Sequence, residues 1–235
     1  MKKDGLDIGD RMKNYEKCSE LHLPKRIPVI IRVDGRAFHS VTKKYFGKEW
    51  SFEFTRIMTE VALGIQKEIQ GCKFAYGQSD EISFLLTDYF TTKTEPWFSY
   101  DLRKLVSVSA SLASSMFTEE LSKHYFYNSF ISFDSRAFSI PQDDVCNYFI
   151  WRQIDATRNA ILFAGHENFS QKQLHGKSCN EIQEMLFQEK DINFNYFQTI
   201  RKRGFCIIDG EVDMNIPIFT KDREYIEKWV YVRED

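Results

Sequence analysis

The sequence predicts an α+β fold with a ferredoxin-like βαββαβ core, an antiparallel sheet, helices on one face of that sheet, and a C-terminal helical and small β extension. Up to about residue 140, strand-like apolar runs and helical hydrophobic periods alternate in the order β-α-β-β-α-β. The composition, 43% hydrophobic and 28% charged over 235 residues, is typical of a folded globular protein. Acidic turns end the first strand-like run and join the next two, so they are the first candidates for a functional site.

The predicted core elements are bounded by residues that start or stop regular structure. Ser51 can cap one helix and Gly71 ends it, while Pro24 closes the first helical segment. In order, the expected elements are a helix over residues 8–21, a strand over 27–33, a loop containing Lys43, Lys44, Gly47 and Lys48, a helix over 51–70, strands over 71–76 and 82–87, a helix over 99–124 and a strand over 130–140.

The rest of the chain predicts an extension rather than a second independent domain. We expect residues 1–140 to form the core with its N-terminal helix, and residues 141–235 to form an extension packed as part of the same domain. This extension contains helical segments over 145–168 and 178–190, the basic run Arg201-Lys202-Arg203, a strand over 205–208, and a tail over 216–235 that predicts a short strand and an exposed charged helix.

Charge and cysteine content exclude several classes of protein. A formal net charge of -2 argues against a globally basic nucleic-acid binder and leaves local basic patches open. The five cysteines are scattered without a C-x-x-C pair, so we expect reduced thiols rather than a disulfide framework or a zinc finger. No run approaches the ~18 apolar residues of a membrane span, and no apolar leader follows the start. We therefore expect a cytoplasmic protein without membrane contact.

Carboxylates end two of the predicted strands. Asp34 follows the apolar run over residues 27–33, and Asp80 and Glu81 lie in the turn between the strands over 71–76 and 82–87. In the βαββαβ order the first two strands run parallel and the third lies antiparallel between them, so both acidic turns share one sheet edge. Converging oxygen ligands suit Mg²⁺ and leave room for phosphate. The alternative is a solvated hairpin loop, because Gly, Ser and Asp all suit turns.

Five motifs follow one another along the chain, spanning about residues 10–204. They are Gly9–Glu16, Asp34–His39, Tyr76–Phe84, Trp151–Asp155, and Asn193–Tyr196 with the Arg-Lys pair that follows. Together they resemble the tRNA-His guanylyltransferase family, and within it the Thg1-like branch. The resemblance implies a catalytic domain similar to the palm of polymerases, two Mg²⁺ ions, ATP and GTP as substrates, tRNA as partner, and a homotetramer.

The resemblance also implies roles for individual residues. Asp34, Asp80 and the carbonyl of Gly35 match metal ligands, and Glu81 matches a neighbouring catalytic acid. The residues that match nucleotide contacts are Arg32, Gly35, Arg36, Ala37, Phe38, His39, Lys48, Ser79 and Lys104. The residues expected to contact tRNA are Arg152, Asn159, Arg201, Lys202 and Arg203.

Some of these residues have an ordinary structural alternative. His39 can be a loop histidine without a titrating role, and Arg32 can be a charge paired with an acid at the sheet edge. The run from Arg201 to Arg203 can be a solvated loop. The composition beyond residue 141 predicts a long helix. Its aromatic residues Tyr148, Phe149 and Trp151 look exposed and could supply a subunit interface.

One departure from the family pattern bears on the substrate. Enzymes dedicated to tRNA-His carry His-Ile-Asn-Asn after the Trp-Arg-Gln motif, whereas this chain has Thr157-Arg158-Asn159-Ala160. The departure favours a template-dependent 3′-to-5′ nucleotidyltransferase that activates and extends the 5′ end of truncated tRNAs. The alternatives are a tRNA-His guanylyltransferase that adds G before the first nucleotide, a nucleotide cyclase, and a non-catalytic RNA-binding ferredoxin-like module.

Overall fold

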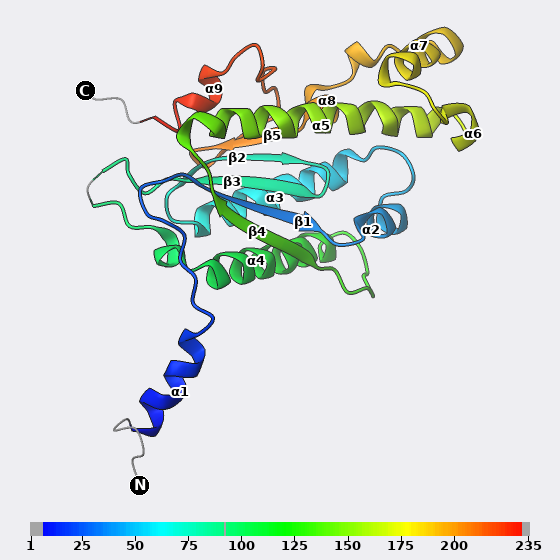
Figure 1. Ribbon diagram of the computed structural model, residues 1–235. Coiled ribbons are helices and arrows are strands. Elements are labelled where there is room, and N and C mark those ends of the chain that lie inside the picture. The colour runs from blue at the N-terminus through cyan, green and yellow to red at the C-terminus, as the bar shows by residue number, and fades with distance from the viewer. Residues whose placement is uncertain (1–6, 92, 232–235) are drawn as a thin grey trace.

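The computed structural model describes residues 7–91 and 93–231, which form a mixed α/β fold around a six-stranded antiparallel sheet (Figure 1). The strand order is β4-β1-β3-β2-β5-β6. The third strand pairs antiparallel with both the first and the second, as the sequence predicted. The strands are β1 Val29–Gly35, β2 Cys72–Gln78, β3 Glu81–Leu86, β4 Phe133–Ser139, β5 Phe205–Ile208 and β6 Glu211–Asp213.

Helices cover both faces of this sheet, so the expectation of helices on one face was wrong (Figure 1). Val29, Ile31 and Val33 of β1 face one apolar cluster, whereas Ile30 faces another. Because neighbouring side chains of a strand point to opposite faces, a strand with apolar side chains on both faces needs a cover on each. The helices are α1 Ile8–Lys17, α2 Phe38–Tyr45, α3 Phe52–Glu68, η1 Trp97–Tyr100, α4 Leu102–Ser122, α5 Gln142–Asn168, α6 Gln171–Leu174, α7 Cys179–Lys190, η2 Phe194–Tyr196, α8 Thr199–Arg203 and α9 Glu224–Glu227.

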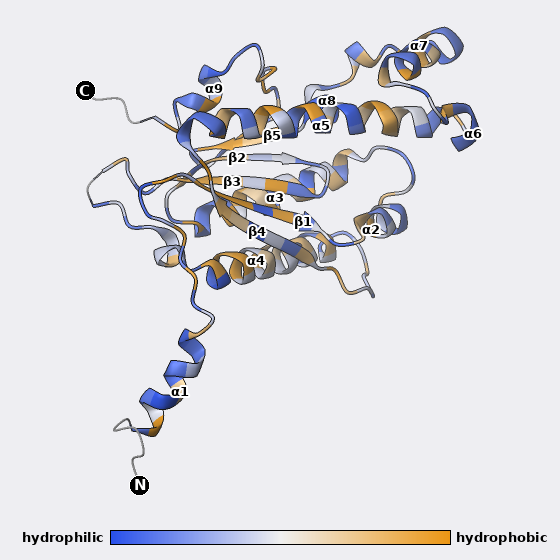
Figure 2. Cartoon of the chain, in the orientation of Figure 1, coloured by the Kyte–Doolittle hydropathy of each residue, from blue (hydrophilic) through white to orange (hydrophobic). Residues whose placement is uncertain are grey.

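The two faces are covered by different parts of the chain. The long helices α3 and α4 bury Ile57, Ile65 and Phe117 in the first cluster. On the opposite face, α5 and α9 contribute Phe149 and Ile226 to the second cluster. Figure 2 shows the hydrophobic colouring concentrated on the strands and on the sides of the helices that face them. Among the described residues, none of the helices is long and apolar enough to cross a membrane.

The extension continues the sheet and adds a small helical unit. Strands β5 and β6 extend the sheet beyond β2, while α6 and α7 pack against the end of α5 around a third apolar cluster. Helix α7 begins with a capping box in which Ser178 and Glu181 satisfy each other's backbone N–H groups. Hydrogen bonds from the backbone and hydroxyl of Ser178 lower the pKa of the exposed Glu181 to about 2.

Two local expectations differ from the structure. The segment expected to be a loop before Ser51 contains α2, which starts without a side-chain cap after Ala37 in the left-handed region (φ 55°). The absence of a capping side chain removes the usual sign of a helix start. The strand expected in the tail lies earlier, as β6 at Glu211–Asp213, and the tail contains the short helix α9. Residues 1–6, 92 and 232–235, which include the end of the predicted tail helix, lie outside the described residues.

Gly204 joins α8 to β5 at a position that accepts no side chain. Its backbone has φ 82° and ψ -159°, a region used almost only by glycine. A Cβ at this position would lie 2.3 Å from the carbonyl oxygen of Gly77 on the neighbouring strand. Gly210 also has a positive φ of 88°, but a Cβ there would meet nothing within 4 Å. A side chain at either glycine would strain the backbone, but only a side chain at Gly204 would also clash with a neighbouring strand.

We expect Gly204→Ala to lower the free energy of unfolding more than Gly210→Ala does. Both substitutions carry backbone strain of about 1–3 kcal/mol, and only the first adds a clash with the Gly77 carbonyl. Urea unfolding followed by circular dichroism measures the difference. Equal losses for the two variants would show that the contact between Gly204 and Gly77 is not tight in solution.

Candidate active site

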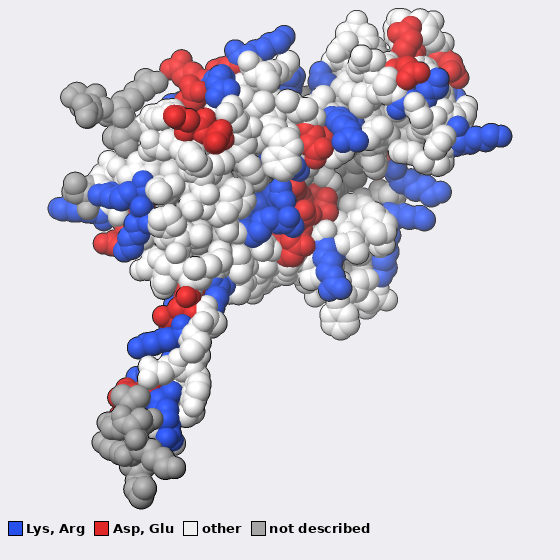
Figure 3. Space-filling model, in the orientation of Figure 1, with Lys and Arg blue, Asp and Glu red and all other residues white. Residues whose placement is uncertain are grey.

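The acidic turns meet at one end of the sheet. Asp34 lies opposite Glu81 in the β1–β3 pairing, and the backbone N–H of Gly35 donates to the carbonyl of Asp80 at 3.1 Å. Ser79 takes the left-handed conformation (φ 50°) that reverses the chain between β2 and β3. Acidic and basic side chains lie next to one another over this end of the sheet (Figure 3). The three carboxylates that the sequence placed at a shared edge are thus adjacent.

Asp34 and Asp80 are carboxylates that no cation neutralises directly. Among the described residues, neither has a Lys, Arg or His nitrogen within 4.0 Å. Burial raises the pKa of Asp34, and the charge of Asp134 on the neighbouring strand β4 adds to this increase. Burial also raises the pKa of Asp80, with a smaller contribution from Asp34, while the hydroxyl of Ser79 donates to it at 3.0 Å. Ionising both carboxylates together is therefore unfavourable unless a positive charge joins them.

Glu81 differs from the two aspartates because it has an arginine partner. Nε and Nη2 of Arg152 on α5 each donate to the carboxylate of Glu81 at 2.7 Å, and both side chains are buried. Burial raises the pKa of Glu81, and the guanidinium works against that shift. Arg152 also contacts Asp155 at 3.3 Å and stacks on Trp151. With its donors engaged and 6% of its surface exposed, Arg152 positions Glu81 and has little surface to offer to tRNA.

Arg32 lies in the same cluster. Its Nε is 3.9 Å from Glu81, its side chain is 13% exposed, and that nitrogen has no hydrogen-bond partner. In the β1 pairings it sits opposite Ser83 on β3 and Arg136 on β4. This arrangement agrees with the alternative expectation of a charge paired with an acid at the sheet edge. The role of Arg32 as a nucleotide contact remains a hypothesis.

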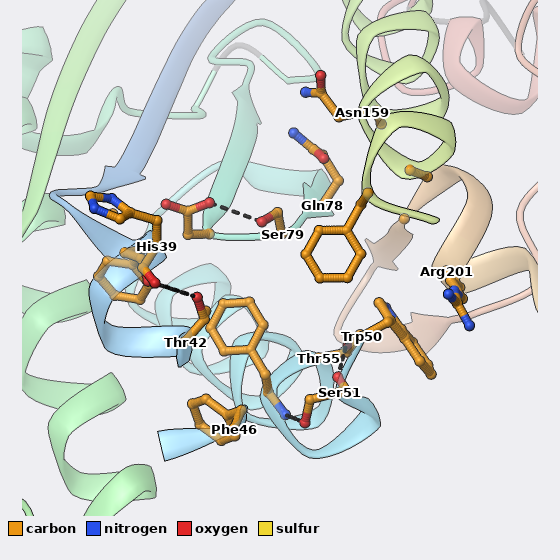
Figure 4. Close-up of a pocket in the computed structure, with 18 of the residues that line it drawn as sticks. His39, Thr42, Phe46, Trp50, Ser51, Thr55, Gln78, Ser79, Asn159 and Arg201 are labelled. Carbon is orange, nitrogen blue, oxygen red and sulfur yellow. Dashed lines mark hydrogen bonds between the residues drawn. The ribbon is translucent and has the colours of Figure 1, made fainter. Parts of the chain in front are cut away.

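A cavity of about 750 Å³ opens beside the acids (Figure 4). Helix α2 contributes His39 and Thr42 to one side, Gln78 comes from the end of β2, Ser79 from the turn after it, and Asn159 from α5. Of the residues predicted from the sequence, those lining it are Gly35, Ala37, Phe38, His39, Lys48, Ser79, Asp80, Asn159, Arg201 and Arg203. The structure therefore brings most of the expected nucleotide contacts into one cavity with three of the expected tRNA contacts, Asn159, Arg201 and Arg203.

Aromatic side chains that the sequence did not single out complete the cavity. Phe46 and Trp50 come from the segment between α2 and α3, and Phe163 comes from α5. Their only signal in the sequence is the high aromatic share of 15%. Gly35, which also lines the cavity, leaves room for the ring of Phe38, because a Cβ at position 35 would lie 2.3 Å from that ring.

Arg201 forms the far wall of the cavity rather than a solvated loop. Its guanidinium lies 3.9 Å from the ring centroid of Phe197 and 5.5 Å from that of Trp50. Glu167 on α5 accepts a hydrogen bond from Arg201 and another, at 2.6 Å, from the backbone N–H of Trp50. Glu167 thereby ties three separate segments together. The basic run was predicted to contact tRNA, but Arg201 within it is committed to this wall.

The other two residues of the basic run have different surroundings. Lys202 donates to the backbone carbonyl of Asn195 at 2.5 Å, and burial together with the charge of Arg203 lowers the pKa of Lys202. Arg203 lines the cavity, and its buried Nε has no hydrogen-bond partner. Arg203 is therefore a member of the run that lines the cavity and forms no ion pair with another described residue.

Lys104 lies away from this site. It sits in the first turn of α4 over the ring of Phe98, whereas Phe117, thirteen positions later on the same helix, contacts Phe38 at the cavity. A helix rises about 1.5 Å per residue, so about 20 Å separates the two positions. Within one chain, Lys104 does not join the other expected nucleotide contacts. Arg36, although it directly follows Gly35, also does not line the cavity.

We expect Arg152→Met to destabilise the fold by about 3–5 kcal/mol at neutral pH, because it leaves Glu81 buried without a partner. Removing the guanidinium raises the pKa of Glu81 further, and a raised pKa means that stability is lost as the pH rises. The deficit should therefore be smallest below the ordinary glutamate pKa and grow above it. Urea unfolding at several pH values measures the effect.

Two further variants control this experiment. Arg158→Met removes an exposed arginine of the same helix, 4.0 Å from Asp155, and should change stability by no more than about 0.5 kcal/mol. Glu81→Gln combined with Arg152→Met should recover part of the loss. A deficit that does not depend on pH would contradict the assignment to the Glu81 charge.

Comparison with known proteins gives a consistent result. The family model described as tRNAHis guanylyltransferase matches residues 9–141. The tRNA(His) guanylyltransferase of Schizosaccharomyces pombe is 33% identical over 86% of this chain and 80% of its own length. The probable human tRNA(His) guanylyltransferase is 29% identical over 83% of this chain and 67% of its own length.

Solved structures agree with the sequence relatives. A bacterial tRNA(His) guanylyltransferase (Thg1)-like protein in complex with ATP is 42% identical, with a TM-score of 0.92 over 97% of this chain and all of its own. A second such structure, in complex with GTP, is 39% identical with a TM-score of 0.83 over 96% of this chain and all of its own. The chain belongs to the tRNA(His) guanylyltransferase family.

Proposed function

We propose that the chain is a Mg²⁺-dependent nucleotidyltransferase that activates and extends the 5′ end of tRNA in the 3′-to-5′ direction, and that it repairs 5′-truncated tRNAs. The observation that carries this proposal is the meeting of Asp34 and Asp80 beside a cavity of nucleotide size. The similar solved structures hold ATP and GTP, and the curated relatives are named for their action on tRNA(His). These names support nucleotides and tRNA as the substrates.

The residues at the sheet edge fit a magnesium centre. Partial burial raises the pKa values of Asp34 and Asp80 even though Arg32, Arg136 and Arg152 act against the shift at Asp34. Neither carboxylate forms an ion pair with a described residue, so a divalent ion would supply the missing charge. Among the described residues no group of three or more His, Cys, Asp and Glu is arranged for a metal. The two carboxylates and the Gly35 carbonyl would fill only part of the octahedral coordination of Mg²⁺. The remaining coordination positions would be open to water and phosphate oxygens, as is usual for protein-bound Mg²⁺. When bound, Mg²⁺ would neutralise charge on the transferring phosphoryl group and the leaving pyrophosphate.

The cavity offers groups for both ends of a nucleoside triphosphate. The first N–H groups of α2 have no side-chain cap, and the helix begins at Phe38, three residues after Gly35, so these groups suit an anion held at the acids. Lys48, Ser79 and Arg203 add donors for phosphate oxygens. The aromatic rings of Phe46 and Phe163 provide apolar surface for a base. Glu81, held by Arg152, adds a fixed negative charge beside the proposed metal ligands.

The sheet supports a palm-like catalytic domain. Strands β4, β1, β3 and β2 stand in the order expected for a ferredoxin-like core, with α3 and α4 on one face. A non-catalytic RNA-binding module of this type would need an open sheet face with stacking aromatics. Both faces are covered by helices here, which disfavours that alternative.

Assembly into a homotetramer also remains part of the proposal. Tyr148 and Phe149 on α5, which looked exposed in the sequence, are buried against the sheet and so do not supply an interface. Trp151 is 53% exposed. Helix α1 buries none of its residues and carries the exposed apolar side chains of Ile8 and Tyr15. Light scattering on the purified protein tests the assembly state.

We expect Asp34→Asn and Asp80→Asn each to lower nucleotide addition by at least about 100-fold, because each removes a charged oxygen ligand where transition-state charge is stabilised. Mg²⁺-dependent pyrophosphate release with ATP, GTP and a 5′-monophosphorylated truncated tRNA measures the loss. Asp209→Asn is the matched control, since Asp209 pairs with Lys73 at the other end of β5. Near-normal turnover by either site variant would contradict the proposed site.

The four residues at Thr157–Ala160 motivate a prediction about substrate choice. Asn159 and Ala160 line the cavity, and Arg158 is exposed on α5. Without the His-Ile-Asn-Asn element, pairing with a template base becomes the main source of selection. We expect addition to several different 5′-truncated tRNAs, in each case of the Watson–Crick partner of the opposing base. Full-length tRNA-His should be the poorer substrate.

The measurement compares addition rates for a truncated tRNA other than tRNA-His, with matched and mismatched nucleotides, against addition of G to full-length tRNA-His. A preference for full-length tRNA-His, or indifference to the template base, would favour the second candidate. That candidate is a tRNA-His guanylyltransferase, and the names of the curated relatives support it.

A further inference from the structure

Two phenylalanines project into solvent from one loop. We define the aromatic loop as residues 123–132, which join α4 to β4. Phe126 is 95% exposed and Phe130 is 107% exposed, the two highest values among the exposed large hydrophobic residues described. Exposed aromatic side chains of this kind are unfavourable in water, and they commonly mark a surface that binds something.

The aromatic loop is braced against α2 while these two rings stay free. Lys44 donates to the side chains of Asn128 and Ser129, at 2.6 Å in each case. The ring of Tyr125 packs against the ring of Tyr45, with centroids 6.1 Å apart. The aromatic loop is therefore packed against α2, and Phe126 and Phe130 are exposed although the loop that carries them is held in place.

The aromatic loop also adjoins the proposed catalytic edge. The carbonyl of Ser132 accepts a hydrogen bond from the backbone N–H of Arg36 at 2.9 Å, and Phe133 lies opposite Gly35 in the β1–β4 pairing. Phe130 is two residues from Ser132. A ligand held at Asp34 and Asp80 would thus have the aromatic loop as an immediate neighbour.

The segments around the two rings carry cations and no acids, although Lys123 pairs with the flanking Glu120 and Lys44 is bonded to the loop itself. Residues 35–48 and 121–133 contain no Asp or Glu, although the whole chain has a net charge of -2. The exposed cations in these segments are Arg36, Lys43, Lys44, Lys48 and Lys123. Figure 3 shows Lys and Arg side chains gathered around α2 beside uncharged surface. Interleaved aromatic and basic side chains are the signature of a surface for unpaired nucleic acid.

We propose that Phe126 and Phe130 form a stacking platform for the unpaired 3′ nucleotides at the acceptor end of the tRNA. This proposal rests on the proposed function, which brings the 5′ end of the acceptor stem to Asp34 and Asp80. The unpaired 3′ strand leaves the same end of that stem, so it emerges beside the catalytic edge. Unpaired bases stack on aromatic side chains, and nearby lysines neutralise the phosphates that connect them.

A second copy of the chain is a weaker candidate for the same surface. In a two-fold contact a patch meets itself, so the cations around α2 would face their own copies. Such like-charge contact opposes association. The charge pattern therefore favours a polyanion, and we commit to RNA.

The test measures binding of two 5′-truncated tRNA transcripts, one intact at its 3′ end and one lacking the terminal unpaired 3′ nucleotides. We expect Phe126→Ala/Phe130→Ala to bind the intact transcript ~10-fold more weakly than wild type does. The double variant should bind the trimmed transcript as wild type does. Phe126→Trp/Phe130→Trp keeps aromatic rings and should retain the wild-type affinity for both transcripts.

Phe187→Ala on α7 is the matched control, because it removes a half-exposed phenylalanine far along the chain from the catalytic edge. Equal binding of the intact transcript by wild type and the alanine variant would overturn the proposal, and so would an equal loss on both transcripts. A change of assembly state with unchanged RNA affinity would assign the loop to a contact between chains instead. Binding needs no catalysis, so a wild-type protein that binds as expected without adding nucleotides would refute the proposed function and leave the platform standing.

Discussion

The clustering of three carboxylates at one end of the sheet, with Glu81 buried and Asp34 and Asp80 partly buried, is the constraint on which the rest of the structure depends. The antiparallel pairing of β1 with β3 places Asp34 opposite Glu81, and the β2–β3 turn adds Asp80 beside them. Three negative charges this close cannot all remain ionised without compensation. Arg152 compensates one of them, and it reaches Glu81 only because α5 crosses the face of the sheet opposite to α3 and α4. The covering of the second face is therefore also an electrostatic requirement of the site.

The acids at this end of the sheet differ in whether an arginine neutralises them. Glu81 is held in one orientation by two short hydrogen bonds, which is costly to desolvate but fixes its geometry. Asp34 and Asp80 lack such a partner, so their oxygens remain available to a ligand that carries positive charge. A site that compensated all three acids internally would be more stable without any ligand. The uneven compensation is what makes this edge suited to binding a cation.

The sequence predicts what depends on local pattern and chain order, and it misses what depends on contacts between distant segments. The convergence of Asp34 and Asp80 follows from the βαββαβ order, and Ser51 caps α3 as its position suggests. The pairs between Arg152 and Glu81 and between Arg201 and Glu167 have no periodic signal, since their members are 71 and 34 positions apart. Both arginines were expected to contact tRNA, and that expectation stays a prediction. The almost entirely apolar run over residues 27–33 is typical of a strand buried on both faces, and the expectation of helices on one face conflicted with it.

Helix α2 shows how one short element can join functions that the sequence presents separately. Phe38 and Thr42 line the cavity, while Lys44 on the same helix holds the aromatic loop through Asn128 and Ser129. The helix begins only three residues after Gly35, so its position depends on the register of β1 against β3 and β4. A shift of α2 would change the cavity and the aromatic loop together. Substitutions on the two sides of α2 should therefore be coupled in their effects, because they act on a shared rigid element rather than on independent sites.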